Sequence, residues 1–515
     1  MKILRSFTHL LLTLGWAVTA AAASPNIVVV LADDVGFSDF GCYGSEIETP
    51  NIDRLAANGI RFTNFHTENK CAPTRASLVT GRYYIHGYHQ PGNLDIAEGL
   101  SLKGYKSCLS GKWSPANKSP GGPLTRGYDR FYGFIASCGS HFAPLGLQRE
   151  GKPAEHEWKE SKEYYFSHAV TDAAVQYIRE TPQDRPLFLH VTYTEPHWPM
   201  QAPAKDVAKY RGKYAAGWDV LQKNRLARMK EMGLVPKDTP LPPRDPRGLP
   251  WEKADNKEWE QRRMEVYAAM IDTVDQGVGK IVAALKETGR YDDTLFIVTA
   301  DNGASSEDYG TNRRTESFLN TETHDGRPMR VGNDPSIMPG PEDTWQTYGR
   351  NWAALSATPF RLYKAYEHRG GISEPLVVQW PKVITRGGQI SDELCHVIDI
   401  MPTVLDAAGV AYPPEFKGRK LNPLDGKSLL PVLQGKPRAG HDALYWGCLF
   451  GKAVQQGKWK LVRQDEKPWE LYDTQKDFNE LNNLAAQHPE KVASMEKAWQ
   501  AWEKSAELPK RNNKE

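Results

Sequence analysis

Acidic and amide side chains follow two apolar segments of the chain at matching places. Asp33 and Asp34 end the segment "PNIVVVLADD", and Asp301 and Asn302 end the segment "DTLFIVTADN". Asp and Asn at the end of a strand most commonly cap turns. Carboxylate and amide oxygens are also the ligands that hard divalent cations such as Ca²⁺ and Mg²⁺ prefer. Because two such pairs stand at equivalent places, the four residues are predicted to bind one divalent metal ion, with Asp39 as a turn or supporting residue.

A cysteine, Cys71, lies in the polar segment "NKCAPTRASLVTGRYY" at residues 69–84, with a proline two residues on and Arg75 four residues on. A cysteine is most often a small buried side chain, so this pattern alone is a weak signal. The residues from Arg75 onward favour a helix. Cys71 is therefore a candidate for chemistry only in combination with other groups.

Three more side chains with chemical potential lie in short motifs: Lys112 in "SGKW", His197 in "EPHWP" and Lys364 in "YKAYEHRGG". A proline-flanked turn would fix the direction of His197, and an ordinary pKa near ~6.5 lets a histidine donate a proton near neutral pH. A single lysine is most often a solvated surface charge, and a lone histidine is commonly packed under a loop. Each of these residues alone is weak evidence for a catalytic role, and only their combination indicates one.

Strands and helices alternate along the part of the chain that carries these motifs. Apolar runs without alternation, typical of strands buried on both faces, lie at residues 27–30, 185–193, 293–303 and 374–381. A short helix with Ile52, Leu55 and Ala56 on one side and a long helix at residues 263–289 separate some of them. This order predicts an α/β layered domain on a mainly parallel sheet. In such sheets ligands bind at the carboxyl ends of strands, where both acidic pairs lie.

Two polar stretches, residues 199–260 and 304–350, interrupt this pattern and are predicted to be long irregular segments, either functional loops or disordered. After about residue 440 the chain changes to short apolar segments and one final helical stretch. These indicate a small antiparallel sheet with a C-terminal helix. The predicted organisation is a leader at 1–23, a catalytic domain at 24–437 and a small C-terminal α+β subdomain at 438–515.

The N-terminal segment and the composition indicate the location of the protein and exclude some kinds of partner. Lys2 and Arg5 precede a short apolar stretch that ends in "AAAS", the pattern of a cleaved signal peptide, and the stretch is too short to span a membrane. We therefore expect a mature protein that is secreted or periplasmic, without a membrane span. The 65 basic and 63 acidic residues nearly balance, which argues against a nucleic-acid partner. Six widely spaced cysteines exclude a dense disulfide framework and leave their pairing open.

Taken together, these motifs resemble the sulfatase family, in which C-x-P-x-R marks a cysteine that is oxidised to formylglycine. The segments that match in family order are "PNIVVVLADDVGFSDFGCYG", "CAPTRASLVTGR", "SGKW", "EPHWP", "TADNG", "TPFRLYK", "GGISEPLVVQWP", "GKWKLV" and "ELYD". They cover nearly the whole chain after the leader. The resemblance implies an alkaline-phosphatase-like fold and hydrolysis of aryl or carbohydrate sulfate esters. It also implies Ca²⁺, with Mg²⁺ less favoured, and a formylglycine-generating enzyme as the maturation partner.

The resemblance also implies a role for each motif residue. Cys71 becomes an aldehyde whose hydrate attacks sulfur with one hydroxyl, while the second hydroxyl allows the sulfated intermediate to collapse and release sulfate. A plain serine ester would lack that exit. Arg75, Lys112 and Lys364 would hold the negative oxygens together with the metal. His197 would protonate the leaving oxygen.

One position departs from the family pattern. The family commonly reads Gly-Lys-Trp-His, whereas Ser114 stands here in the place of the histidine that assists sulfate release. Another group, for which His86, His89 and His368 are candidates, takes over this step, or turnover is impaired. A smaller change is Arg369, which occupies a place often held by Glu.

Two alternatives to an active sulfatase remain open at this point. A phosphoester hydrolase of the same superfamily would share the strand-end carboxylates, but it would carry Ser or Thr as nucleophile. A non-catalytic relative that binds sulfated glycans would keep the cations and lose several reactive groups, of which only the one at Ser114 is missing. The choice of alcohol would depend on the two long loops. Tryptophans in or near them either stack on substrate rings or pack in the core: Trp198, Trp218, Trp345 and Trp352.

Overall fold

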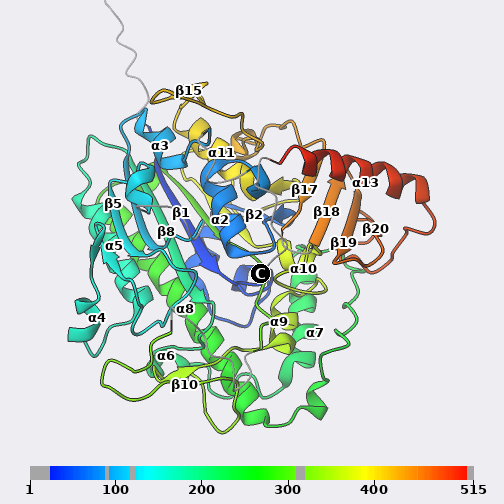
Figure 1. Cartoon of the computed structure of the whole chain (residues 1–515), viewed down its shortest axis with the longest axis horizontal. Coiled ribbons are helices and arrows are strands. Elements are labelled where there is room, and N and C mark those ends of the chain that lie inside the picture. The colour runs from blue at the N-terminus through cyan, green and yellow to red at the C-terminus, as the bar shows by residue number, and fades with distance from the viewer. Residues whose placement is uncertain (1–23, 87–91, 116–121, 309–318, 449–450, 507–515) are drawn as a thin grey trace, which may run out of the picture.

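The computed structural model describes residues 24–86, 92–115, 122–308, 319–448 and 451–506. Its centre is a ten-stranded sheet (Figure 1). The strands, from one edge to the other, are β13 (Gln389–Ser391), β2 (Ile60–Phe62), β12 (Leu376–Gln379), β9 (Thr294–Ala300), β1 (Asn26–Asp33), β8 (Leu187–Pro196), β4 (Lys106–Lys112), β5 (Arg130–Phe134), β6 (Gln148–Arg149) and β7 (Lys152–Pro153). The five strands from β9 to β5 are parallel, and β12 runs antiparallel to β9. The predicted mainly parallel α/β fold is confirmed.

Helices cover both faces of this sheet because its central strands are apolar on both sides. Successive residues of β1 point to opposite faces: Val28 and Val30 pack into one core cluster, Val29 and Leu31 into another. The first cluster contains α1 (Pro50–Ala57), α5 (Phe166–Glu180) and α8 (Lys257–Glu287), and the second contains α2 (Cys71–Thr80), α3 (Ile96–Ser101) and α11 (Ile400–Ala407). Every residue of β1 is buried, which explains why its sequence shows no polar alternation.

The C-terminal part forms a separate small sheet of β17 (Leu444–Trp446), β18 (Gly451–Gln456), β19 (Trp459–Gln464) and β20 (Glu470–Asp473), all antiparallel. The last helix, α13 (Pro489–Lys504), packs Met495 and Trp499 against Val454, Leu461 and Leu471 of this sheet. Figure 1 shows these orange strands and the red helix on the right of the molecule. The predicted antiparallel sheet with a C-terminal helix is confirmed.

The expectation of an irregular segment at residues 199–260 was wrong in part. This segment contains α6 (Ala204–Ala208) and the 15-residue helix α7 (Gly217–Glu231). The buried face of α7 carries Arg225 among its apolar residues, and this arginine pairs with Asp39 and Glu46. A charged residue on the buried face hides the helical pattern of apolar residues. In residues 304–350, the described part contains two short strands, β10 (Arg330–Val331) and β11 (Thr344–Trp345), as expected of a mostly irregular segment.

The remaining described strands and α-helices are short or peripheral: β3 (Phe65–His66), β14 (Cys395–His396), β15 (Glu415–Phe416), β16 (Arg419–Lys420), α4 (His156–Glu160), α9 (Arg350–Ser356), α10 (Arg369–Ile372) and α12 (Leu430–Leu433). Short 3-10 helices are η1 (Gly41–Tyr43), η2 (Tyr84–His86), η3 (Pro123–Arg126), η4 (Trp251–Lys253), η5 (Tyr291–Asp293) and η6 (Val397–Asp399). Among the described residues, none of the helices is long and apolar enough to cross a membrane. The expected leader at residues 1–23 lies outside the described residues. All six cysteines are described, and none of these six forms a disulfide bond.

Candidate active site

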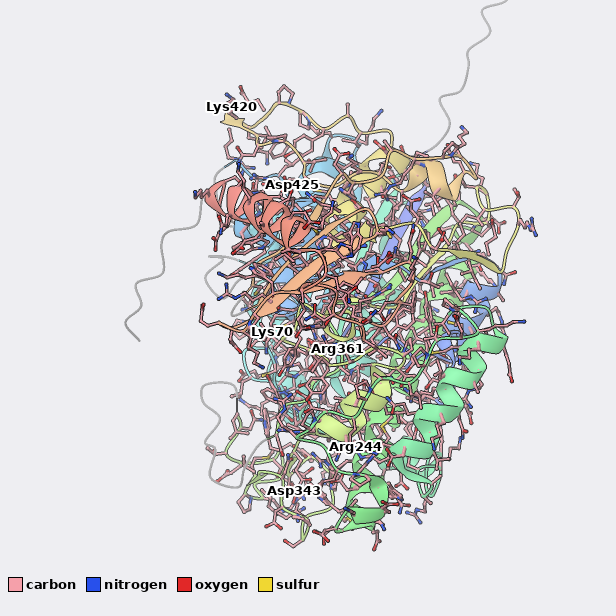
Figure 2. The ribbon with its side chains drawn as sticks, turned by 90° about the vertical axis from the view of Figure 1, so that its right-hand side faces the viewer. Lys70, Arg244, Asp343, Arg361, Lys420 and Asp425 are labelled. Carbon is pink, nitrogen blue, oxygen red and sulfur yellow. The ribbon has the colours of Figure 1, made fainter. Side chains whose placement is uncertain are left out.

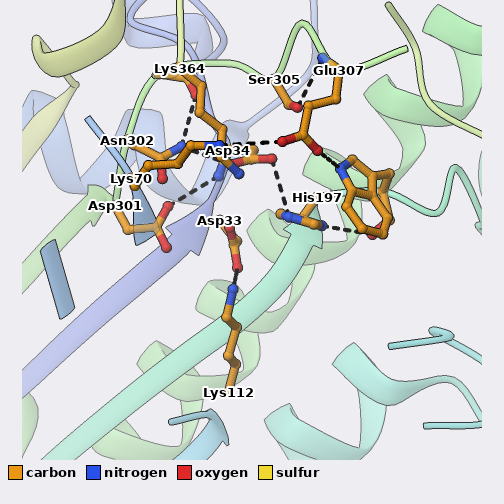
Figure 3. A network of polar contacts seen from close by, with 12 residues as sticks. Asp33, Asp34, Lys70, Lys112, His197, Asp301, Asn302, Ser305, Glu307 and Lys364 are labelled. Atoms are coloured by element: carbon orange, nitrogen blue, oxygen red, sulfur yellow. Dashed lines mark hydrogen bonds and ion pairs between the residues drawn. The ribbon is translucent and has the colours of Figure 1, made fainter. Parts of the chain in front are cut away.

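The carboxyl ends of four adjacent parallel strands deliver the side chains of the site. In the sheet register, Ala32 stands beside Ala300, and Asp33 stands beside Pro196. The residues that follow β9 and β8 are therefore next to the end of β1. The side chains that meet there are Asp301 and Asn302 after β9, Asp33 and Asp34 at the end of β1, His197 after β8 and Lys112 at the end of β4 (Figure 3).

Cys71 is the first residue of α2 and is partly exposed. Its sulfur, one oxygen of Asp33 and one oxygen of Asp301 all lie within 4.8 Å of one another. The start of a ten-residue helix carries unpaired N–H groups and the positive end of the helix dipole, which favour negative charge. Cys71 therefore lies where an anionic group would be both reachable and stabilised.

Arg75, one turn further along α2, is buried beneath Cys71 and ties three strand ends together. Its Nε donates to Oδ2 of Asp301 over 2.9 Å, and its Nη1 donates to the carbonyl of Lys112 over 3.0 Å. Its Nη2 also lies 3.3 Å from Oδ2 of Asp33. The planar guanidinium serves such a multiple contact better than an ammonium group would.

Two buried lysines complete the ionic cluster. The Nζ of Lys112 pairs with Oδ2 of Asp33, and the Nζ of Lys364 lies 2.6 Å from Oδ1 of Asp34. Together with Arg75 they face three carboxylates, so the protein part of the site is close to neutral. A divalent cation would make the site positive, as an anionic ester requires.

Three buried oxygens in this cluster have no hydrogen-bond partner among the described residues: Asp33 Oδ1, Asp34 Oδ2 and Asn302 Oδ1. Such oxygens are costly unless a ligand binds them. Asp34 is also held at a φ of +67°, a backbone conformation that is strained for a residue with a side chain. Oxygen donors of this kind are what a hard divalent cation takes. The four residues predicted as metal ligands therefore fit such an ion.

The pKa values of the carboxyl groups also reflect this crowding. Burial would raise the pKa of Asp33, but Lys112, His197 and Arg75 hold it well below its usual range. Burial, opposed by Lys364 and reinforced by Asp33, raises the pKa of Asp34 to about 6. Burial and the charge of Asp33 likewise raise the pKa of Asp301 to about 6. A bound cation would favour the ionised form of each group.

His197 is buried and directed by the residue that follows it. Its Nδ1 lies 2.7 Å from the carbonyl oxygen of Trp198, and its Nε2 lies 3.6 Å from Oδ2 of Asp34. Burial and the nearby Lys364 lower the pKa of His197 to about 3. The ring thus presents Nε2 to the cluster.

Two of the three histidines considered as substitutes for the family histidine face other partners. The ring nitrogens of His86 face Asp425 and Ser505, and Nε2 of His368 faces Glu470. His89 lies outside the described residues. Ser114 itself is buried at a φ of +37°, and its hydroxyl has no hydrogen-bond partner among the described residues.

Other residues singled out in the sequence have a packing role. Arg369 is buried between the rings of Phe360 and Phe478 and donates to the carbonyl of Phe478, so it does not reach the site. The four tryptophans considered for stacking on a substrate are all buried, with at most 7% of their surface exposed. Asp39 supports the turn after β1 by accepting hydrogen bonds from Gly36 N over 2.8 Å and from Tyr267.

Sequence reasoning missed several residues that lie around the cluster. Glu307 accepts a hydrogen bond from Nε1 of Trp198 and pairs with Lys70, the residue before Cys71. His141 pairs with Glu195 and lies 3.0 Å from the carbonyl oxygen of His197, which supports the turn that carries this histidine. No local pattern marks these residues, because their roles depend on contacts between distant loops.

The site combines a thiol at the start of a helix, buried cationic side chains and oxygen atoms that could bind a cation. This arrangement, at the carboxyl ends of the central strands, suits a hydrolase of anionic esters. Comparison with known proteins gives the family. The model of the Sulfatase family matches residues 25–410, and the model "N-sulphoglucosamine sulphohydrolase, C-terminal" matches residues 362–504. The chain belongs to the sulfatase family and is a sulfuric ester hydrolase.

Individual relatives agree with this assignment. The chain is 32% identical to an uncharacterised sulfatase of Schizosaccharomyces pombe, with 94% of each chain covered. It is 29% identical to an arylsulfatase of Klebsiella aerogenes, with 82% of this chain and 95% of the relative covered. Among solved structures, Ps i-CgsB in complex with k-i-k-neocarrahexaose has a TM-score of 0.68 at 22% identity, covering 95% of this chain and 94% of that one, and shows the shared fold.

Proposed function

We propose that the protein is an exported sulfatase that hydrolyses aryl or carbohydrate sulfate monoesters through a formylglycine made from Cys71. The observation that carries this proposal is the position of Cys71. It begins α2 within 4.8 Å of carboxylate oxygens of Asp33 and Asp301, and it is partly exposed in an otherwise buried ionic cluster. Maturation requires a formylglycine-generating enzyme, which must reach the segment around Cys71 before or during folding.

Asp33, Asp34, Asp301 and Asn302 are proposed to hold the metal ion, for which Ca²⁺ is preferred on family resemblance. When bound, the ion supplies a positive centre that polarises a sulfate oxygen. The three oxygens without partners in this group support the assignment.

The cationic side chains are proposed to bind and orient the sulfate group. Arg75, Lys112 and Lys364 are buried, so each interacts with an anionic ester in surroundings of low polarity, where charge interactions are strong. The formylglycine hydrate supplies two hydroxyls on one carbon, one for attack and one for release of sulfate. Arg75 lies one helical turn from this position and holds the carboxylates beside it.

His197 is proposed to give a proton to the leaving oxygen. The 2.7 Å contact between Nδ1 and the carbonyl of Trp198 fixes the ring, so that Nε2 faces the cluster. The negative charge of a bound sulfate ester favours the protonated ring, which counteracts the effect of burial. A general acid of this kind matters most for alcohols that leave poorly without a proton.

The proposal is tested with full-length protein from a host that contains a formylglycine-generating enzyme. We expect release of sulfate from 4-nitrophenyl sulfate or from one of a panel of monosaccharide sulfates. Cys71→Ala should abolish turnover without changing the fold, and Cys71→Ser should support at most one turnover per molecule. Undiminished steady-state turnover in either variant would exclude the formylglycine mechanism. The expected site of leader cleavage, after residue 23, is checked by N-terminal sequencing of the exported protein.

A further inference from the structure

The carboxylate of Glu307 lies between the two segments that carry the reactive groups (Figure 3). Glu307 belongs to the loop that follows β9, five residues beyond Asn302. Its Oε2 accepts a hydrogen bond from Nε1 of Trp198 over 2.6 Å, and its Oε1 lies 3.3 Å from Nζ of Lys70. None of the roles proposed above uses this residue.

Each partner of Glu307 is adjacent to a residue with a proposed role. Lys70 is the N-cap of α2 and directly precedes Cys71. Trp198 directly follows His197, and its carbonyl oxygen is the group that faces Nδ1 of this histidine. The rings of His197 and Trp198 also lie close, with centroids 4.5 Å apart. A movement of the Trp198 indole would therefore change the orientation of His197.

The two contacts of Glu307 differ in strength. The Lys70 pair is partly exposed, with 23% and 33% of the two side chains accessible, so it contributes little. In Figure 2, Lys70 lies below the orange strands of the C-terminal sheet. The bond from Trp198 is shorter, and a charged acceptor roughly doubles the strength of a hydrogen bond. Although burial would raise the pKa of Glu307, Lys364, Lys70 and His197 lower it to about 2, so the acceptor is charged at neutral pH.

The loop that carries Glu307 is itself fixed to the site. The backbone N–H of Lys364 donates to the carbonyl of Ala304 over 3.1 Å, and Asn302 at the start of the loop donates to Asp34 over 2.7 Å. Glu307 is thus anchored at the metal end of the loop and extends towards Trp198. Through these contacts, Glu307 can fix the His197 ring relative to the ionic cluster at the end of β1.

From these contacts we infer that Glu307 is a positioning residue for His197, which it holds through Trp198 in the direction needed to protonate the leaving alcohol. This inference rests on the proposed function of His197. It predicts that Glu307 matters for esters whose alcohol needs a proton, such as sugar or alkyl sulfates. It should matter little for 4-nitrophenyl sulfate, because nitrophenolate leaves without help. A residue needed only for folding would affect both esters equally.

The test compares kcat/KM for one sugar or alkyl sulfate and for 4-nitrophenyl sulfate in wild type, Glu307→Ala, Glu307→Gln, Trp198→Phe and the double variant Trp198→Phe/Glu307→Ala. We expect Glu307→Ala to lose about 10- to 100-fold on the first ester and less than about threefold on the second, as part of the ~10²–10⁴-fold effect of a general acid. Glu307→Gln keeps an acceptor for the indole N–H and should restore most of the loss.

Two further comparisons separate positioning from other roles. If Glu307 acts through Trp198, the double variant should be no worse than the more impaired single variant. Asp308→Asn is the matched control, because this neighbouring carboxylate faces Asn333 instead of Trp198, and it should stay within about twofold of wild type. Equal losses on both esters, or additive losses in the double variant, would overturn the inference.

A crystal structure of Glu307→Ala gives a readout that does not depend on activity. We expect the indole of Trp198 to shift and the contact between His197 Nδ1 and the Trp198 carbonyl to lengthen. An unchanged His197 would overturn the inference even if activity fell. If wild type released no sulfate from any ester, the proposed function would fail, and the crystal structure would still decide whether Glu307 positions the ring.

Discussion

Two buried ionic clusters in this protein differ in how completely their charges are matched. In the C-terminal part, Lys460 and Glu480 are both fully buried, and both oxygens of Glu480 have donors: Nζ of Lys460 at 2.6 Å and the N–H of Arg369 at 2.9 Å. In the cluster at the end of β1, Asp33, Asp34 and Asn302 each keep one buried oxygen without a hydrogen-bond partner among the described residues. The charges of the Lys460–Glu480 pair are matched within the protein, whereas the oxygens at the end of β1 are not all satisfied.

The difference separates charges that serve the fold from charges that serve a ligand. An unsatisfied buried polar atom costs about 1–3 kcal/mol, and a ligand that binds these three oxygens would recover that cost. The three oxygens lie together at the end of β1, where a bound ligand would satisfy them. We therefore expect substitutions in the Lys460–Glu480 pair to affect stability. Substitutions in the cluster at the end of β1 should affect activity and ligand binding.

The largest expected effect is on the cluster at the end of β1. Asp301→Ala, or removal of divalent ions by a chelator, should reduce sulfate release by at least about 10³-fold, because the remaining charges lose their common cation. Added Ca²⁺ should raise the Tm of wild type. At a Ca²⁺ concentration of 100 times its Kd, the free energy of unfolding should increase by about 2.7 kcal/mol. The same addition should leave the Tm of Asp301→Ala unchanged.

The metal prediction is checked by elemental analysis, activity and thermal unfolding of the same preparations. Active protein without a divalent ion, or an equal Tm shift in Asp301→Ala, would contradict the metal site. An exposed carboxylate of α5, changed in Asp172→Asn, serves as the control for surface binding of Ca²⁺.

The next effect concerns the Lys460–Glu480 pair. Lys460→Met removes one partner of a buried ion pair and should lower the free energy of unfolding by about 3–5 kcal/mol. Activity per folded molecule should stay within about twofold. Lys460→Met/Glu480→Gln removes the unpaired charge and should recover part of the stability. A loss of activity at unchanged stability would show that the two clusters do not divide in this way.

A smaller effect is expected at Ser114, where the family histidine is missing. Ser114→His introduces a base two residues after Lys112 and should change kcat or its pH profile by up to about tenfold while KM stays within about twofold. Pre-steady-state kinetics check this, because slow sulfate release gives a burst of alcohol in wild type. Absence of a burst, together with no effect of the variant, would show that position 114 does not govern release.

The smallest expected effect is on how the free energy of unfolding falls at acidic pH. Burial would raise the pKa of Glu480, but Lys460 lowers it below its usual value. The ionised group therefore stabilises the fold above its unfolded pKa, and this contribution is lost as pH falls through the folded pKa. Glu480→Gln should show a shallower loss of stability between about pH 5 and pH 3, measured by urea unfolding. An unchanged slope would mean that Glu480 is not the titrating group.

The central fold and the ionic cluster could be predicted because their signals are local. The apolar run of β1 ends at Asp33, and the rule that ligands lie at the carboxyl ends of strands brings Asp301 to the same place. The helix α7 and the carboxylate of Glu307 could not be predicted. The buried face of α7 includes Arg225, whose charge is matched by Asp39 and Glu46 from a distant loop. The role of Glu307 depends on its contact with Trp198, 109 residues away in the sequence, which no local pattern indicates.

The most direct test of the central claim is a mass spectrum of the peptide that contains Cys71, taken from the same preparation whose turnover is measured. Protein made with a formylglycine-generating enzyme should carry an aldehyde at position 71, and its sulfate release should rise in proportion to the aldehyde content. Protein made without the enzyme should carry the thiol and be inactive. Full turnover by protein that carries only the thiol would contradict the account.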